Sequence, residues 1–173
     1  VWSRVGPDDI GFAVVSGLAL RPGDNTLLAG THGNGMFFLA PPRQPQVAFV
    51  TEASAQTETT TTTSGCRSYT DVAIELQILA APTGDATVTV TTSGTASQGS
   101  DFDILTPNAE LTFPDGSTAN QTLNLRLYND NDQEGPETIV LDFTISGTTD
   151  ATKANFATTH TLTLNDDGDV DPG

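Results

Sequence analysis

Residues 72–80, V-A-I-E-L-Q-I-L-A, decide the fold class of this chain. Apolar side chains stand at every second position, at Val72, Ile74, Leu76 and Ile78. A β-strand places alternate side chains on opposite faces, so this period predicts a strand with one buried face. A helix needs apolar residues three and four positions apart, and no segment of the chain sustains that spacing.

The same alternation recurs on both sides of this segment. Turn residues such as Pro114-Asp115-Gly116 separate the repeats, as expected between short antiparallel strands. Seven short strands of this kind predict an all-β fold, a two-sheet antiparallel β-sandwich across residues 46–167. Besides 72–80, the predicted strands are 47–50, 88–90, 111–113, 123–127, 139–145 and 162–164.

Residues 1–40 predict a separate, strand-rich N-terminal arm. Apolar stretches at 14–20, 27–30 and 36–39 favour strands, and Gly33-Asn34-Gly35 is typical of a tight hairpin. The proline-rich residues 41–45 predict a stiff linker before the sandwich, and residues 168–173 an acidic C-terminal tail. The chain starts at Val1 without a signal peptide, so we expect both ends to be cut from a longer precursor.

Composition excludes several classes of function. Of the 173 residues, 22 are acidic and 6 basic, a net charge of −16 that excludes binding to nucleic acid or anionic membranes. No apolar run approaches the roughly 18 residues of a transmembrane helix, so no membrane insertion is expected. The single cysteine, Cys66, excludes an internal disulfide framework and a multi-thiolate zinc site. Abundant Thr, Gly, Asp and Ser favour a secreted, extracellular β-protein.

Acidic residues gather where the predicted strands end. Carboxylates about 4 Å apart repel by on the order of 4 kcal/mol per pair at an effective dielectric constant of 20, so such a cluster needs a cation or raised pKa values. Several hard oxygen ligands select Ca²⁺. The alternative interpretation is that these acids are ordinary solvated loop charges. The candidate metal ligands are Glu52, Asp101, Asp130, Asp132, Glu134, Asp166 and Asp167.

Four motifs in order resemble the Calx-β family over residues 46–167. They are the run 93–102, S-G-T-A-S-Q-G-S-D-F; the strand Leu111-Thr112-Phe113; the Asp-rich turn and Glu-x-x-Glu of 130–137; and Asp166-Asp167. The resemblance implies an Ig-like sandwich that binds Ca²⁺ at one end. It implies a ligand set of Glu52, Asp101, Asp130, Glu134, Asp166 and Asp167, to which Asp132 adds an oxygen.

This chain departs from the family pattern at three positions. Asn129 and Asn131 stand where the family often has further Asp, and Phe102 replaces Tyr. Fewer negative charges imply fewer ions or weaker binding. An EF-hand is excluded, because Leu141 occupies the twelfth position of the loop that begins at Asp130, where Glu is required.

The arm resembles the last blade of a sialidase- or sortilin-type β-propeller. The resemblance rests on residues 18–22, L-A-L-R-P, and 29–37, A-G-T-H-G-N-G-M-F, with Asn34 where Arg is usual. A propeller followed by a Calx-β domain is similar to large secreted surface proteins of gliding-type bacteria. A lone blade cannot close a propeller, and two or three strands alone are marginally stable.

The apolar side chains of the arm therefore need a partner. Strand donation to the sheet edge of a neighbouring subunit is one solution, and head-to-tail donation propagates into a filament. Folding back onto its own sandwich is the alternative. We expect a calcium-binding structural or adhesive module that self-associates through residues 1–40; other adhesin domains and surface glycans are further candidate partners. The alternative is a non-polymerising calcium-binding spacer of a surface adhesin.

Catalysis finds little support in the sequence. There is no Gly-x-Ser-x-Gly elbow and no phosphate-binding glycine loop, so a non-enzyme is expected. His32 and His160 favour structural roles, and Cys66 a small core or edge residue or an intermolecular disulfide. A fragment of a propeller-type glycosidase is the third hypothesis. The polar run at 57–63 predicts an exposed loop or edge strand whose hydroxyl groups are candidates for glycosylation.

Overall fold

The computed structural model describes residues 14–21, 26–32, 36–39, 43–58, 68–129 and 135–166. The chain divides into two compact units, Val1–Arg43 and Gln44–Gly173. The described elements are strands, apart from the short 3-10 turn η1 (Pro107–Ala109). Among the described residues no helix is long and apolar enough to cross a membrane.

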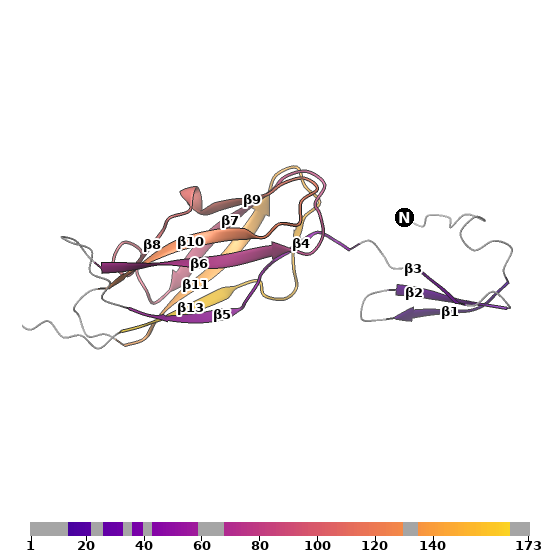
Figure 1. Ribbon diagram of the computed structural model, residues 1–173, viewed down its shortest axis with the longest axis horizontal. Coiled ribbons are helices and arrows are strands. Elements are labelled where there is room, and N and C mark those ends of the chain that lie inside the picture. The colour runs from indigo at the N-terminus through magenta and orange to yellow at the C-terminus, as the bar shows by residue number, and fades with distance from the viewer. Residues whose placement is uncertain are drawn as a thin grey trace, which may run out of the picture. The chain divides into compact units, whose positions relative to one another are not determined.

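The first unit contains a three-stranded antiparallel sheet (Figure 1). Its strands are β1 (Val15–Arg21), β2 (Thr26–Thr31) and β3 (Met36–Leu39), in the order β1-β2-β3. These are the three strands that the sequence predicts for the arm. Every residue of β1 is exposed, whereas Thr26 and Ala29 of β2 are buried. The sheet therefore leaves the side chains of its edge strand β1 in solvent.

The second unit is a sandwich of two five-stranded sheets (Figure 1). The first sheet has the order β12-β4-β6-β10-β8, and the second the order β5-β13-β11-β7-β9. Most neighbouring strands are antiparallel, but β12 lies parallel to β4 and β5 parallel to β13. The strands are β4 (Gln46–Phe49), β5 (Ala53–Thr57), β6 (Ser68–Ile78), β7 (Ala86–Gly94), β8 (Phe102–Ile104), β9 (Glu110–Phe113), β10 (Gln121–Asn129), β11 (Glu137–Ser146), β12 (Thr152–Lys153) and β13 (His160–Asn165).

The chain changes sheets between β4 and β5. Strand β4 pairs with β6 until Phe49, opposite Leu76, and the Val50 N–H still donates to the Glu75 carbonyl at 2.9 Å. Three residues later, Ala53 pairs with Thr161 of β13 in the other sheet. The first strand of the sandwich is therefore split between both sheets.

Alternate residues of the facing strands form the core. Ile74, Leu76 and Ile78, on the face that the sequence predicts to be buried, are at most 5% exposed. The Phe49 and Phe143 rings meet edge to face, with centroids 5.5 Å apart. Burial of side chains of this size contributes about 1.5–3 kcal/mol each. The largest fully buried side chains are Phe49, Phe102, Phe113, Phe143, Leu76, Leu123, Leu125, Ile139, Leu141, Leu162, Leu164 and His160.

His160 fixes the segment that crosses between the sheets. Its side chain is fully buried, and Nδ1 lies 2.7 Å from the Thr51 carbonyl oxygen. A carbonyl only accepts, so Nδ1 donates, and Nε2 forms a second hydrogen bond with Ser54 Oγ at 2.8 Å. Both ring nitrogens are thus bonded, as the structural role expected for His160 requires.

The predicted fold class is confirmed, because all seven predicted strands are present in an all-β sandwich. The structure adds β5, β8 and β12, which the sequence did not predict. Strand β5 reads A-S-A-Q-T and has no large apolar residue, while β8 and β12 have only three and two residues. Edge strands this short or this polar carry no detectable apolar period.

Candidate metal site at the acidic end

Strand ends of both sheets meet at one end of the sandwich (Figure 1). In the first sheet, Ser68 at the start of β6 pairs with Asn129 at the end of β10. In the second sheet, Glu137 at the start of β11 pairs with Leu164 near the end of β13. The loop 95–101 joins the two sheets here. Glu58, Asp101, Glu137 and Asp166 are the described acidic residues of this end, which we call the acidic end.

Asp101 lies in a tight turn that connects the sheets. Its Oδ2 accepts from the Ser97 N–H at 2.5 Å, and its own N–H donates to the Ser97 carbonyl at 2.9 Å. The Asp101 carbonyl accepts from the Tyr128 N–H at 2.8 Å, which ties the turn to the end of β10. A carboxylate that uses one oxygen in this way retains acceptor capacity on the other, the capacity that a cation ligand needs.

The other end of the loop 95–101 is anchored to β11. The Thr95 N–H donates to the Thr138 carbonyl at 3.0 Å, and the Thr138 N–H donates to Thr95 Oγ1 at 2.9 Å. Gly94 makes this approach possible, because its φ is 120° and a Cβ there would lie 2.1 Å from the Thr138 carbonyl oxygen. The loop is thereby held between Tyr128 of one sheet and Thr138 of the other.

Glu58 and Asp166 lie side by side at the ends of β5 and β13. The Glu58 N–H donates to the Asn165 carbonyl at 2.8 Å, directly after the Asn165–Thr57 pair of the two parallel strands. Asp166 is the next residue of the chain. The second sheet therefore brings Glu58 and Asp166 to this end, and on the other side of β13 it adds Glu137 of β11, which pairs with Leu164.

The structure corrects one member of the predicted ligand set, Glu52. Its carbonyl accepts from the Thr161 N–H at 2.9 Å, and its Oε1 accepts from the Ala157 N–H at 3.2 Å. Asp166 directly follows the end of β13 and is five residues from Thr161. At 3.3 Å per residue, the two residues are about 16 Å apart along the strand. Glu52 therefore belongs to the crossover between the sheets, and the structure does not bring it to the acidic end.

Of the other predicted ligands, Asp101 and Asp166 lie at this end. Asp130, Asp132, Glu134 and Asp167 lie outside the described residues, although Asp130 directly follows Asn129 and Asp167 directly follows Asp166. The described residues on their own contain no group of three or more His, Cys, Asp or Glu side chains close enough to hold a metal ion.

Two acids at this end are not among the predicted ligands. Glu58 stands inside the threonine-rich run, which the sequence predicts to be an exposed loop or edge strand. Glu137 is the second Glu of the Glu-x-x-Glu motif at 134–137, to which the sequence assigns no ligand role. Glu58 directly follows β5 and Glu137 begins β11, and that position at a strand end is the signal that finds them.

The basic side chains of the described sandwich are engaged elsewhere. Arg126 binds Asp71 through two hydrogen bonds, of 2.7 and 2.9 Å, and lies 3.6 Å from the centroid of the Tyr69 ring. Lys153 pairs with Asp142 and donates to the Phe143 carbonyl at 3.2 Å. Hydrogen bonds from these cations hold the pKa values of Asp71 and Asp142 below their ordinary values. Arg126 and Lys153 therefore do not neutralise the negative charges of the carboxylates at the acidic end.

Two pockets open on the sides of the sandwich. One, of about 280 Å³, includes Ser54, Glu75 and His160 in its wall, and the other, of about 410 Å³, lies between β7 and β8. Neither pocket is lined by a described acid of the acidic end. The glycosidase hypothesis, which needs a pocket beside those acids, gains no support from these two.

Comparison with known proteins identifies the fold. No family model and no curated protein matches the chain. Among solved structures, the apo form of the Calx CBD1 domain superposes with a TM-score of 0.55 at 20% identity, covering 72% of this chain and 99% of that one. The CBD12 structure from CALX1.2 gives 0.53 at 20% identity, covering 70% of this chain and 44% of that one.

A third similar structure is a putative carbohydrate binding protein from Bacteroides ovatus. Its TM-score is 0.53 at 6% identity, covering 70% of this chain and 37% of that one. At these identities the likeness shows the fold, an Ig-like β-sandwich of the Calx-β type. The resemblance of residues 1–40 to a propeller blade is not supported by these comparisons.

Proposed function

We propose that this chain is an extracellular structural module that binds Ca²⁺ at the acidic end and self-associates through residues 1–40. The observation that carries the calcium site is the meeting of strand ends from both sheets, which places Glu58, Asp101, Glu137 and Asp166 at one end of the sandwich. One of the similar solved structures is the calcium binding domain CBD12 of CALX1.1, which supports the proposal by its likeness in fold.

The donor chemistry fits a hard divalent cation. Side chains and turn carbonyls at this end offer oxygen atoms, and no cysteine or histidine lies in the described part of the acidic end. Ca²⁺ takes six to eight oxygen ligands in an adaptable geometry, which suits ligands drawn from several loops. Asp101 and Asp166 are proposed as ligands together with Glu58; Asp130, Asp132, Glu134 and Asp167 remain proposed by their places in the sequence.

The role proposed for calcium is mechanical. A cation bound to residues of the loop 95–101 and of the β13 end joins the two sheets where only loops connect them. It also removes the repulsion among carboxylates that otherwise opposes closure of this end. The module is then rigid in calcium and loosened at this end without it.

Isothermal titration calorimetry with Ca²⁺ tests the site. Asp101→Asn and Asp166→Asn are each expected to weaken binding at least about tenfold, equivalent to 1.4 kcal/mol. Glu58→Gln is expected to weaken it similarly. Glu52→Gln is the matched control, since it lies at the crossover and should bind as the parent chain does. Equal affinity in all four variants, or no heat with the parent chain, would refute the site.

Self-association is proposed from the exposed surface of the arm. Leu18 and Leu20 of β1 are 67% and 60% exposed, and Met36 of β3 is 70% exposed. Static light scattering of the full chain over a range of concentrations tests this, with Leu18→Glu/Leu20→Glu as the disabled variant. A concentration-dependent rise in mass that the variant loses supports self-association. A parent chain that stays at 18.0 kDa favours the alternative, a non-polymerising calcium-binding spacer.

A further inference from the structure

One edge of the sandwich is only half covered. Strand β9 pairs with β7 from Ala86 to Thr89, but β7 continues to Gly94. On its other side β7 is paired with β11 throughout this stretch. No described strand pairs with residues 90–93 on the β9 side. Unpaired strand edges are templates for the addition of another strand.

The turn before β9 is the reason for this gap. In η1, Asn108 and Ala109 have φ values of 55° and 53°, both in the left-handed region that residues other than glycine rarely occupy. This turn brings the chain onto β7 only from Glu110 onward. Residues 90–93 of β7, which lie beyond the start of this pairing, therefore keep an open edge.

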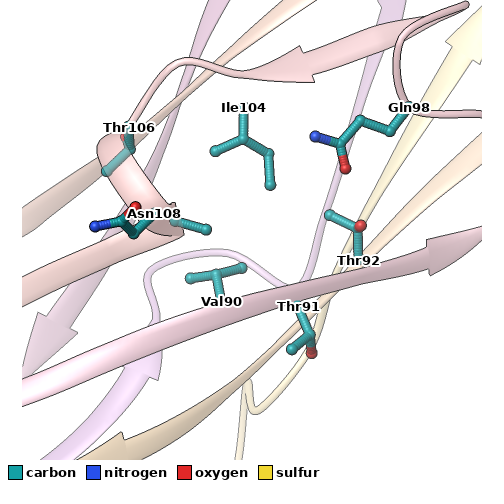
Figure 2. Close-up of a pocket in the computed structure, with 8 residues that line it drawn as sticks. Val90, Thr91, Thr92, Gln98, Ile104, Thr106 and Asn108 are labelled. Carbon is teal, nitrogen blue, oxygen red and sulfur yellow. The ribbon is translucent and has the colours of Figure 1, made fainter.

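A pocket of about 410 Å³ lies directly beside the open edge. Figure 2 shows Val90 of β7 and Ile104 of β8 on opposite sides of it, with Asn108 towards one end and Gln98 towards the other. Strand β8 pairs with β10 alone among the named strands. An added strand on β7 would point every second side chain into this pocket, between the two sheets.

Strand β1 has the properties of such an added strand. It is the edge strand of its own sheet, and none of the described strands pairs with its outer edge in the order β1-β2-β3. Leu18 and Leu20 are 67% and 60% exposed, and they lie on one face of the strand, beyond the irregularity in pairing between Val15 and Gly17. The alternation of apolar side chains on β1 therefore matches a strand that fills a pocket from one side.

Charge decides between β1 and a second sandwich as the occupant. In residues 1–43, three Arg balance three Asp, so this unit has no net charge. Residues 44–173 hold the other 19 acids and 3 bases, and thus the whole net charge of −16. Edge-to-edge pairing of two sandwiches brings like charges together, whereas pairing of an arm with a sandwich does not.

We propose that β1 of one copy adds to the open edge of β7 in a second copy, with Leu18 and Leu20 in the pocket between β7 and β8. This inference rests on the proposed self-association and names its acceptor. Because the donor and acceptor surfaces differ, the contact is head to tail and leaves a free donor and a free acceptor at the ends of each assembly. Chains joined in this way form filaments or closed rings.

Disulfide trapping between two different full-length chains tests the pairing. One chain carries Ala19→Cys and the other Thr91→Cys, both with Cys66→Ser, so that a mixed disulfide forms only between copies. Ala19 lies on the face of β1 opposite to Leu18 and Leu20, and Thr91 is exposed on the outer face of β7. The matched control replaces Thr91→Cys by Thr87→Cys, on the same strand and face but paired on both sides, with Ser146 and Thr112.

A mixed dimer with Thr91→Cys and its loss with Thr87→Cys is the expected result. A second readout does not depend on register: Thr92→Lys, in the pocket wall, should abolish assembly in light scattering, and Thr87→Lys should not. If the parent chain assembles but neither readout distinguishes position 87 from 91 or 92, the acceptor edge is wrong and the proposed self-association stands. If the parent chain does not assemble at all, both fail.

Discussion

The two units of this chain differ in how far they bury apolar side chains and in their net charge. The sandwich has a core of large apolar side chains, in which Leu76, Leu123 and Leu125 have no exposed surface. The arm leaves Leu18 and Leu20 more than half exposed. The sandwich carries the whole net charge, and the arm carries none. The comparison shows that the sandwich has a core of its own, whereas the arm has exposed apolar side chains that a partner could bury.

The contrast also divides the proposed roles. Carboxylates at the strand ends of a closed sandwich suit a cation site. The packed core fixes the residues from which the loops start, and the charged side chains lie outside that core. Apolar side chains on an edge strand suit association, because strand pairing and apolar burial act together there. A cation at the acidic end would neutralise part of the negative charge of the sandwich. The weaker repulsion between sandwiches would favour the approach of further copies.

The largest expected difference between the units is in the response to truncation of leucine. Leu125→Ala in the core should lower the free energy of unfolding by about 2–5 kcal/mol. Leu18→Ala on β1 should change the unfolding of the sandwich by less than about 0.5 kcal/mol, as is usual for surface sites. Chemical denaturation at a low protein concentration measures both. Equal losses would contradict the division into a closed and an open unit.

Calcium should stabilise the sandwich and leave the arm unaffected. At 100 times the dissociation constant, a ligand that binds only the folded state adds about 2.7 kcal/mol. For a domain of this size that raises the melting temperature by roughly 5–10 °C. Differential scanning calorimetry in Ca²⁺ and in chelator measures the shift. Asp101→Asn/Asp166→Asn should reduce it strongly and Glu52→Gln should keep it; a shift retained in the double variant would place the ion elsewhere.

The buried histidine at the sheet crossover provides a smaller test. Ser54→Ala removes the hydroxyl group that is hydrogen-bonded to His160 Nε2 and leaves that buried nitrogen without this partner. The expected cost is about 1–3 kcal/mol in the free energy of unfolding. Ser93→Ala, at an exposed serine of β7, is the control and should cost almost nothing. A cost no larger for Ser54 than for Ser93 would show that His160 does not hold the crossover.

The smallest effect is expected from the surface ion pair of Arg126 and Asp71. Both side chains are partly exposed, at 28% and 48%, so Arg126→Gln should cost only about 0.2–1 kcal/mol. Arg126 lowers the pKa of Asp71 in the folded state. The contribution is therefore present above the unfolded pKa of about 3.9 and is lost as the pH falls through the lower folded pKa. Denaturation of the parent chain and of Arg126→Gln at neutral and at strongly acidic pH measures the difference in their free energies of unfolding. That difference should shrink in acid, and a larger difference in acid would contradict this account.

Much of the sandwich could be predicted from the sequence, because burial of one face imposes a period of two. Leu123, Leu125 and Leu127 on β10 show that period clearly, and all three are buried. Strand β5 could not be predicted, because it reads A-S-A-Q-T and lies at a sheet edge, where one flank needs no partner. The order of the strands in the two sheets also depends on pairings between distant segments that no local pattern encodes.

The positions of the proposed ligands could be predicted from the sequence only in part. Asp101 and Asp166 follow recognisable motifs, and the structure places both at the acidic end. The sequence predicts Glu52 as a ligand because it follows the first apolar strand. The sheet crossover moves the effective end of that strand from Phe49 to Thr57, so Glu58 takes the place expected for Glu52. A local sequence pattern gives no sign of a strand that changes sheets.

Hydrogen–deuterium exchange of the full chain, measured by mass spectrometry with Ca²⁺ and with chelator, tests the proposed calcium site most directly. A cation at the acidic end should slow exchange in peptides that cover residues 95–102 and 160–166. Peptides that cover β1 and the crossover at 50–54 should not change. Protection confined to the acidic end is the predicted result. Unchanged exchange at 95–102 and 160–166 in saturating Ca²⁺, or protection centred on Glu52, would contradict the proposed site.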